Sequence, residues 1–159
     1  MHEVARLATQ LTERKGSVAV AESCTGGLIA KSLTDTAGSS AWFGYGVVSY
    51  SNAAKQRLLS VRAETLAAQG AVSEAVVREM AEGVRILAQA EVGLAVSGIA
   101  GPGGGTEDKP VGTVWCAWSG STQTVAKMQR FSGDREEVRD KTAYWALSEL
   151  NTLLPALCD

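Results

Sequence analysis

Apolar residues at helical spacing recur in several segments of the chain. Near the N-terminus, Val4, Leu7, Ala8 and Leu11 stand three or four residues apart, which is the period of a helix with one buried face. This spacing predicts a helix over 3–15. Further helices are predicted at 28–35, in a short stretch capped by Asn52, in a segment capped by Ser73 that extends to about Leu87, and from a cap at Asp134 to about Leu157.

Between the helical segments lie short runs of apolar and β-branched residues, which are typical of strands. These runs occupy 17–21, 42–50, 92–98, 111–119 and 124–131. The last two are joined by a short turn at Gly120, which predicts an antiparallel hairpin. Because helices and strands alternate along the first part of the chain, we predict an α/β fold. Its form would be an α/β/α sandwich with a mixed, mostly parallel sheet and an antiparallel hairpin.

Length and composition favour one domain over residues 1–159. The chain has 159 residues, of which 45% are apolar, and a chain of this size buries enough surface to fold without disulfides or a metal. Lys and Arg number 15 against 17 Asp and Glu. This balance lacks the basic footprint of a nucleic-acid-binding protein, so we expect no nucleic acid as a partner.

Neither a membrane segment nor a secretion signal is expected. No run of 18 or more apolar residues occurs, whereas a transmembrane helix needs about 20. The N-terminal segment is amphipathic, unlike the charged and then apolar order of a signal peptide. Cys24, Cys116 and Cys158 are widely spaced and fit reduced thiols, so we expect a cytoplasmic protein.

The chain contains a single histidine, His2, beside the N-terminus. A Ser-His-Asp triad, a Cys-His dyad and a histidine-rich metal site are therefore not expected. No two cysteines stand at metal-ligand spacing either. Hydrolytic chemistry in this chain has to use hydroxyls, carboxylates, lysine or a thiol without imidazole.

A polar turn with two glycines, at 22–27, directly follows the first predicted strand. In open α/β sheets ligands bind at such strand ends. Gly26 and Gly27 allow close approach of the backbone, and the following helix would direct free N–H groups toward an anion. An ordinary strand-to-helix turn capped by Ser23 or Thr25 explains the same residues.

A glycine-rich loop follows the strand predicted over 92–98. It carries Gly101, Gly103 and Gly104, and ends in Thr106, Glu107 and Asp108. The loop fits neither the phosphate-binding pattern of nucleoside triphosphatases nor that of dinucleotide-binding folds, because a strand follows it. The hydrogen-bonding residues around it favour a ligand-facing loop, and a mobile tether is the alternative.

A third segment combines a serine, a tyrosine and a lysine. Ser40 precedes the strand predicted over 42–50, and Tyr50 and Lys55 follow it. Without histidine, lysine is the best remaining base for a serine nucleophile, provided that burial or a neighbouring charge lowers its pKa. A surface lysine and a capping serine are the plain alternative. Cys24 is a rival nucleophile because a thiol at a helix N-terminus has a lowered pKa, although small buried cysteines are usually packing residues.

Taken together, several blocks of the sequence resemble the CinA C-terminal-domain family. They are AESCTGG (21–27), GSSAWF (38–43), VSYSNAAK (48–55), GAVSE (70–74), SGIAGPGGGTEDKPVGTVW (97–115) and SGDREEVR (132–139). The blocks follow one another over nearly the whole chain, without a departure at the motif positions. The chain resembles the stand-alone form, which lacks the additional N-terminal domain of the two-domain members.

The enzymes of that family are nicotinamide-nucleotide amidases. The resemblance implies hydrolysis of the carboxamide of nicotinamide mononucleotide to nicotinic acid mononucleotide and ammonia, in pyridine nucleotide recycling, with neither a metal nor an organic cofactor. It implies Ser40 as the nucleophile, Lys55 as its general base and Tyr50 as the group that positions them or relays between them. The substrate-binding residues that it implies are Ser23, Thr25, Gly26, Gly101, Gly103, Gly104 and Thr106. Arg135 and Arg139 are either candidates for the phosphate or ordinary surface charges.

Two other functions fit the same resemblance. A member of the family can bind a nucleotide without turning it over, which a test for ammonia release would distinguish. It can also act as an interaction protein in competence or the DNA-damage response, although a net charge of −2 disfavours direct contact with DNA. Four tryptophans in a small apolar domain, together with the resemblance, favour a homo-oligomer (dimer or higher).

Overall fold

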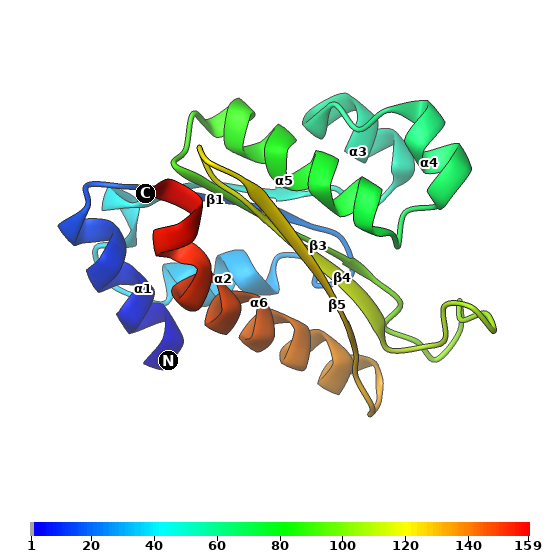
Figure 1. Cartoon of the computed structure of the whole chain (residues 1–159). Helices are drawn as coiled ribbons and strands as arrows, with labels where there is room; N and C mark the ends of the chain where they lie inside the picture. The colour runs from blue at the N-terminus through cyan, green and yellow to red at the C-terminus, as the bar shows by residue number, and fades with distance from the viewer. Residues whose placement is uncertain (1) are drawn as a thin grey trace.

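The computed structural model describes residues 2–159, which form one five-stranded sheet between two layers of helices (Figure 1). The strands are β1 (Val18–Glu22), β2 (Phe43–Val48), β3 (Val92–Gly98), β4 (Thr113–Ser119) and β5 (Thr124–Arg130). Their order across the sheet is β2-β1-β3-β4-β5. The three strands β2, β1 and β3 run parallel, and the hairpin β4–β5 adds two antiparallel strands. The predicted mixed sheet with its hairpin is confirmed.

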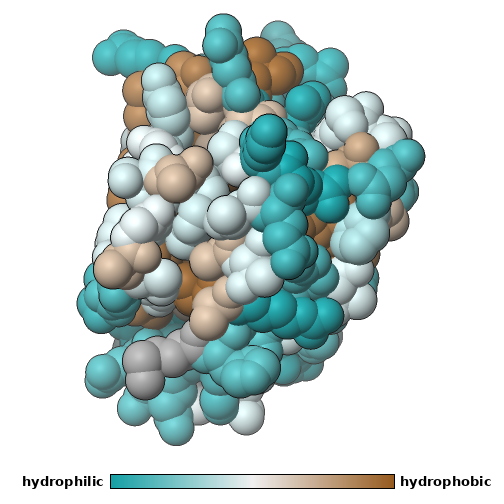
Figure 2. All heavy atoms as spheres, turned by 90° about the vertical axis from the view of Figure 1, so that its left-hand side faces the viewer, coloured by the Kyte–Doolittle hydropathy of each residue, from teal (hydrophilic) through white to brown (hydrophobic). Residues whose placement is uncertain are grey.

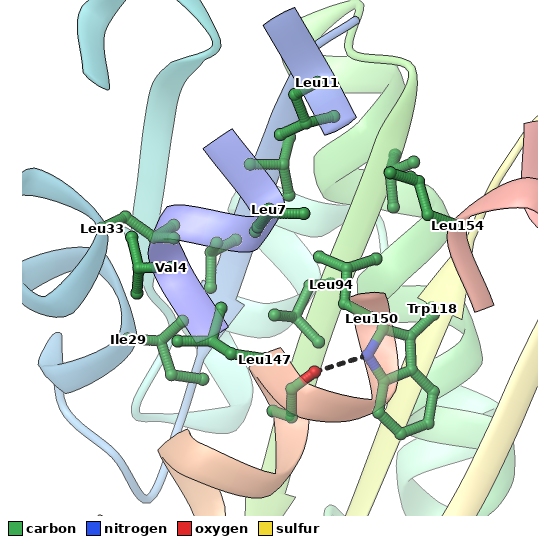
Figure 3. Close-up of a cluster of buried hydrophobic side chains, with 14 of the residues drawn as sticks. Val4, Leu7, Leu11, Ile29, Leu33, Leu94, Trp118, Leu147, Leu150 and Leu154 are labelled. Carbon is green, nitrogen blue, oxygen red and sulfur yellow. Dashed lines mark hydrogen bonds between the residues drawn. The ribbon is translucent and has the colours of Figure 1, made fainter. Parts of the chain in front are cut away.

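One face of the sheet is covered by α1 (His2–Glu13), α2 (Leu28–Thr34) and α6 (Arg135–Cys158). Their apolar stripes meet the sheet around Leu94 and Trp118, as Figure 3 shows for side chains such as Leu7, Ile29 and Leu150. The indole N–H of Trp118 donates to the carbonyl of Ala146 at 3.0 Å, so the polar atom of this buried ring is satisfied. This layer is therefore a continuous apolar core.

The side of the molecule that carries α1 shows few hydrophobic side chains. In Figure 2, which faces this side, hydrophilic side chains and side chains of intermediate hydropathy cover most of the surface, and hydrophobic ones appear in small patches. This is the surface expected of amphipathic helices whose apolar stripe packs on a sheet. None of the helices in residues 2–159 has the length and apolar character needed to cross a membrane.

The opposite face is covered by α5 (Glu74–Ala88), with α3 (Asn52–Leu59) and α4 (Ala63–Gln69) beside it. Helix α4 lies in a segment for which the sequence predicts no helix. Seven residues with only Leu66 and Thr65 buried carry too little apolar periodicity to indicate a helix. A second difference is the cap of α3, which is Ser51 rather than Asn52: the Ser51 hydroxyl accepts from the Ala54 N–H at 3.0 Å.

The parallel strands place three loops at one edge of the sheet. The register aligns Glu22 of β1 with Val48 of β2 and with Val96 of β3, so β1 and β2 end at the same level and β3 continues for two more residues. The segments that follow these ends are 23–27, 49–55 and 99–112. They contain the polar residues singled out in the sequence, and the site is therefore built at this edge.

Candidate active site

A cavity of ≈ 290 Å³ opens at the carboxyl ends of β1, β2 and β3. It is lined by Ser23, Cys24, Tyr50, Asn52, Lys55, Ala71, Val72, Ser97, Gly98, Ile99, Ala100, Gly101, Gly103, Gly104 and Arg135. Each of the three segments singled out in the sequence contributes residues to this lining. The cavity is thus the place where separate polar segments converge.

Lys55 is the central side chain of the cavity. It projects from the first turn of α3 and is only 1% exposed. Its Nζ lies 2.9 Å from the Oγ of Ser23, and it donates to the carbonyl of Ser49 at 2.7 Å and to that of Tyr50 at 3.4 Å. All polar contacts of this buried amine are therefore made to uncharged oxygens.

Burial lowers the pKa of Lys55 from 10.5 to about 8, because the charged ammonium loses its hydration without gaining a carboxylate partner. An appreciable fraction of the side chain is then the neutral amine near physiological pH. A neutral lysine beside a serine hydroxyl is the arrangement needed for proton abstraction. Lys55 thus meets the condition stated for a lysine base, burial that lowers its pKa.

The turn that carries Ser23 is held by the residue before it. Glu22 is 1% exposed, and its carboxylate accepts from the backbone N–H groups of Gly27, Ile29 and Ala30 at 3.2, 3.0 and 2.8 Å. The prediction that these N–H groups at the start of α2 are free for a ligand anion is wrong, because they already donate to the carboxylate of Glu22.

The backbone of the same turn is also held from α6. Arg139 donates to the carbonyls of Cys24 and Thr25, both at 3.1 Å. In a trans peptide the N–H points away from the preceding C=O, so the Thr25 N–H is directed away from Arg139. Within the described residues, the N–H groups of Cys24 and Thr25 donate to no other residue. Two unpaired donors therefore follow Ser23 directly.

The thiol of Cys24 is not activated. Burial raises its pKa from 9.0 to about 11, since a thiolate in apolar surroundings loses its hydration. The expected lowering by a helix N-terminus is wrong, because the short helix α2 begins at Leu28 and its first N–H groups are already bound by Glu22. The protonated thiol makes Cys24 a poor nucleophile.

Ser40 lies apart from this arrangement. It stands in a short 3₁₀ turn, Ser39–Ala41, where its side chain is exposed and does not line the cavity. Lys55 makes its serine contact with Ser23, and the hydroxyl of Tyr50 contacts Arg135 at 3.2 Å. The structure thus brings Tyr50 and Lys55 to one cavity, whereas Ser40 does not line that cavity.

The residues expected to bind substrate divide into two groups. Ser23, Gly101, Gly103 and Gly104 line the cavity. The other three do not: Thr25 is fully buried with its hydroxyl unpaired, Gly26 packs near Arg139 at a φ of +59°, and Thr106 is exposed, where it closes a turn with Lys109. These three shape the loops around the cavity.

No role in a site is predicted from the sequence for Glu22, Ser49 or Asn52. Glu22 is detectable, because it is the one charged residue in the otherwise apolar strand VAVAE. Ser49 is fully buried, and its backbone N–H donates to the Glu22 carbonyl at 2.8 Å while its own carbonyl accepts from Lys55. No local signal in the sequence reveals this linking role.

A larger groove of ≈ 530 Å³ adjoins the cavity and shares Val72 with it. Its charged groups are already paired: Lys109 donates to the carbonyl of Gln69 at 2.7 Å, and Arg78 forms an ion pair with Glu74 at 2.8 Å. Among residues 2–159, no group of three or more His, Cys, Asp or Glu side chains is arranged to hold a metal ion. The smaller cavity, with its buried amine, is therefore the candidate site.

Comparison with known proteins gives matches over nearly the whole chain. The family model of the CinA C-terminal domain matches residues 2–154. The chain is 54% identical over 149 residues to "Nicotinamide-nucleotide amidohydrolase PncC" of Enterobacter agglomerans, covering 92% of this chain and 91% of that protein. It is 52% identical over 141 residues to the protein of the same name from Escherichia coli (strain K12), covering 88% and 86%. The crystal structure of the competence damage-inducible protein A (ComA) from Klebsiella pneumoniae subsp. pneumoniae MGH 78578 matches with a TM-score of 0.94 and 45% identity, covering 97% of this chain and 96% of that chain.

Proposed function

Because the chain belongs to the CinA C-terminal domain family, we propose that it hydrolyses the carboxamide of nicotinamide mononucleotide to nicotinic acid mononucleotide and ammonia. The names of relatives that are 52–54% identical over most of the chain support this substrate. The observation that carries the proposal is the contact of 2.9 Å between the buried Lys55 amine and the Ser23 hydroxyl inside a cavity. The reaction would return a pyridine nucleotide for reuse.

The contacts of Lys55 suit a general base. A neutral amine has two N–H donors and one lone pair. The carbonyls of Ser49 and Tyr50 accept the two N–H groups, which leaves the lone pair for the hydroxyl of Ser23. Lys55 would take the proton of Ser23 as the Oγ attacks the carboxamide carbon.

The steps after attack follow from this pair. The tetrahedral adduct collapses when Lys55 returns the proton to the carboxamide nitrogen, which leaves as ammonia, and Ser23 carries the acyl group. A water molecule then gives its proton to Lys55 and attacks the ester, so that the acid is released and the Ser23 hydroxyl is regenerated. The unpaired N–H groups of Cys24 and Thr25 are the nearest candidates to stabilise the oxyanion in both steps.

Ser23, rather than Ser40, is the nucleophile that we propose. Ser40 is exposed in its 3₁₀ turn and does not line the cavity, whereas Ser23 is 8% exposed and bonded to the base. The resemblance of the sequence assigns this role to Ser40, so the two serines are the alternatives that an experiment has to separate.

The test is ammonia release from nicotinamide mononucleotide in the presence of EDTA, with the wild type, Ser23→Ala, Ser40→Ala and Lys55→Ala. We expect release by the wild type and by Ser40→Ala, and a loss of about 10³-fold or more in Ser23→Ala and Lys55→Ala, because nucleophile and base act as a unit. A large loss of ammonia release in Ser40→Ala alone would identify Ser40 as the nucleophile instead. Binding of the nucleotide without ammonia release by the wild type would overturn the catalytic proposal.

A further inference from the structure

The charges around the cavity are all of one sign. Among the described residues that line it, Lys55 and Arg135 carry basic groups and none is Asp or Glu. Lys55 is buried and bonded to Ser23 and two carbonyls. Arg135, at the first residue of α6, is exposed at the rim. It is therefore the basic group of the cavity that remains open to a ligand.

Two hydrogen bonds hold the guanidinium of Arg135 in place. Nη1 donates to the carbonyl of Gly101 at 2.8 Å, and Nη2 lies 3.2 Å from the hydroxyl of Tyr50. A guanidinium has five N–H donors, so three remain for an anion. Arg135 is thus oriented before a ligand arrives, and its planar fork suits a phosphate.

The glycine-rich loop adds backbone donors beside Arg135. Ala100, Gly101, Gly103 and Gly104 line the cavity, and within residues 2–159 their N–H groups donate to no acceptor. Gly101 and Gly104 have φ values of +84° and +88°, which L-residues with side chains rarely adopt. Successive free N–H groups in such a backbone form a concave site for anions.

The other basic groups and helix ends near the cavity are already engaged. Arg139 uses Nε and Nη2 on the carbonyls of Cys24 and Thr25, and the first N–H groups of α2 are bound by Glu22. Lys109 lines the neighbouring groove and donates to Gln69. Among the described residues around the cavity, Arg135 is therefore the basic side chain that remains free for the anionic group of a ligand.

Tyr50 connects this place to the reacting pair. Its backbone carbonyl accepts from Lys55, and its hydroxyl contacts Arg135. One tyrosine side chain thus separates Lys55 from Arg135 along the cavity. Nicotinamide mononucleotide carries its carboxamide at one end and its phosphate at the other, and it fits this order of groups.

We propose that Arg135 and the N–H groups of Ala100, Gly101, Gly103 and Gly104 bind the 5′-phosphate of the substrate and select the nucleotide over the nucleoside. This inference rests on the proposed function, since it takes a mononucleotide as the ligand. The phosphate then anchors the substrate, and the carboxamide is directed toward Ser23 at the other end of the cavity.

The test compares kcat/KM for nicotinamide mononucleotide and for nicotinamide riboside in the wild type and in Arg135→Gln. We expect a fall of about 10- to 100-fold for the nucleotide, mostly through KM, and a change of less than about 3-fold for the riboside, because the charge-assisted bonds are lost only where a phosphate is present. Arg135→Lys keeps the charge but lacks the planar fork, so we expect its kcat/KM for the nucleotide to lie between those of the wild type and Arg135→Gln. The matched control is Arg130→Gln, because Arg130 is an exposed arginine of β5 outside the cavity. We expect this control to leave kcat/KM unchanged for both substrates.

An equal fall for both substrates in Arg135→Gln, or no fall for either, would overturn the phosphate assignment. Calorimetry with ribose 5-phosphate and with ribose distinguishes failure of the phosphate assignment from failure of the proposed function, because the binding measurement needs no turnover. We expect the wild type to bind the phosphate ester more tightly than the sugar, and Arg135→Gln to lose this difference. If the wild type hydrolyses no mononucleotide but still shows this difference, the hydrolytic function fails and the phosphate site stands.

Discussion

The charge state of Lys55 links its burial to the chemistry proposed for the cavity. The side chain has no carboxylate partner and contacts three oxygens of uncharged groups, so its ammonium form is not compensated. Burial moves the pKa to about 8, close to physiological pH. A base with this pKa combines a usable neutral fraction with sufficient basicity.

This pKa predicts the pH dependence of activity. Lys55 acts only when it is neutral, so kcat/KM should be low at pH 6, rise about tenfold per pH unit below the pKa, and level off above about pH 8. The measurement is ammonia release between pH 5.5 and 9.5 at constant ionic strength. A profile that is flat over pH 6–8 would show that the free enzyme uses no base of this pKa.

At the scale of elements, the junction between β1 and α2 depends on a buried carboxylate. Glu22 joins the last residue of a central strand to the first turn of a short helix through three N–H···O bonds. Its backbone carbonyl also accepts from Ser49, whose own carbonyl accepts from Lys55. One residue thus positions both the turn with Ser23 and the segment that leads to Lys55.

Glu22→Gln tests this junction. Glutamine keeps the size of the side chain but turns an NH₂ group toward N–H donors, so we expect a loss of about 1–3 kcal/mol in the free energy of unfolding together with a lower kcat. Urea unfolding and ammonia release at saturating nucleotide are the two measurements. The control is Glu13→Gln at the exposed end of α1, which should stay within about 0.5 kcal/mol. If Glu22→Gln matched this control in both measurements, the carboxylate would not hold the junction.

At the scale of the whole molecule, the site depends on the sheet order β2-β1-β3. The two apolar cores on the faces of the sheet fix the central strand β1, and the parallel register brings the ends of its neighbours beside it. The edge of the sheet supplies Ser23, Lys55 and the glycine-rich loop from three different loops. Because no buried residue of these two cores lines the cavity, we expect a variant of the site to retain the fold.

The buried lysine should also make the stability of the whole fold depend on pH. The pKa of Lys55 is about 8 in the folded state, against an ordinary value of 10.5. Between pH 8 and 10.5 the unfolded state therefore binds more protons at Lys55 than the folded state does. The contribution of Lys55 to stability consequently rises with pH over this range. The free energy of unfolding of the wild type minus that of Lys55→Met should increase between pH 8 and 10.5 by up to about 3 kcal/mol. It should be constant between pH 6 and 7, where both states are charged.

Urea unfolding of both proteins at several pH values, followed by tryptophan fluorescence, measures this difference. Using the difference between the two proteins removes the titration of all shared groups, provided that the substitution leaves their environments unchanged. A difference that does not change from pH 7 to 10.5 would show that the folded protein leaves the pKa of Lys55 at its ordinary value.

The features that depend on neighbours in the chain could be predicted from the sequence. Apolar periodicity indicated the layers of helices and the strands, and Asp134 caps α6 in a capping box with Glu137, as expected for a residue of that type before a helix. The absence of usable histidine directed attention to lysine, and Lys55 is indeed the buried base candidate. The polar segments after the strands were recognisable as parts of a site because strand ends are local features.

Only the tertiary structure decided which serine faces Lys55. Ser23 is 32 positions from Lys55 along the chain, and their contact depends on the parallel pairing of β1 with β2. Ser40 is closer in sequence but lies in the turn before β2, whereas Lys55 follows its end, so the strand separates them. Likewise, only the packing of α6 assigned Arg139 to the carbonyls of one loop and left Arg135 at the rim. Local patterns predict elements, whereas register and packing determine which distant side chains meet, because those contacts depend on the arrangement of the whole sheet.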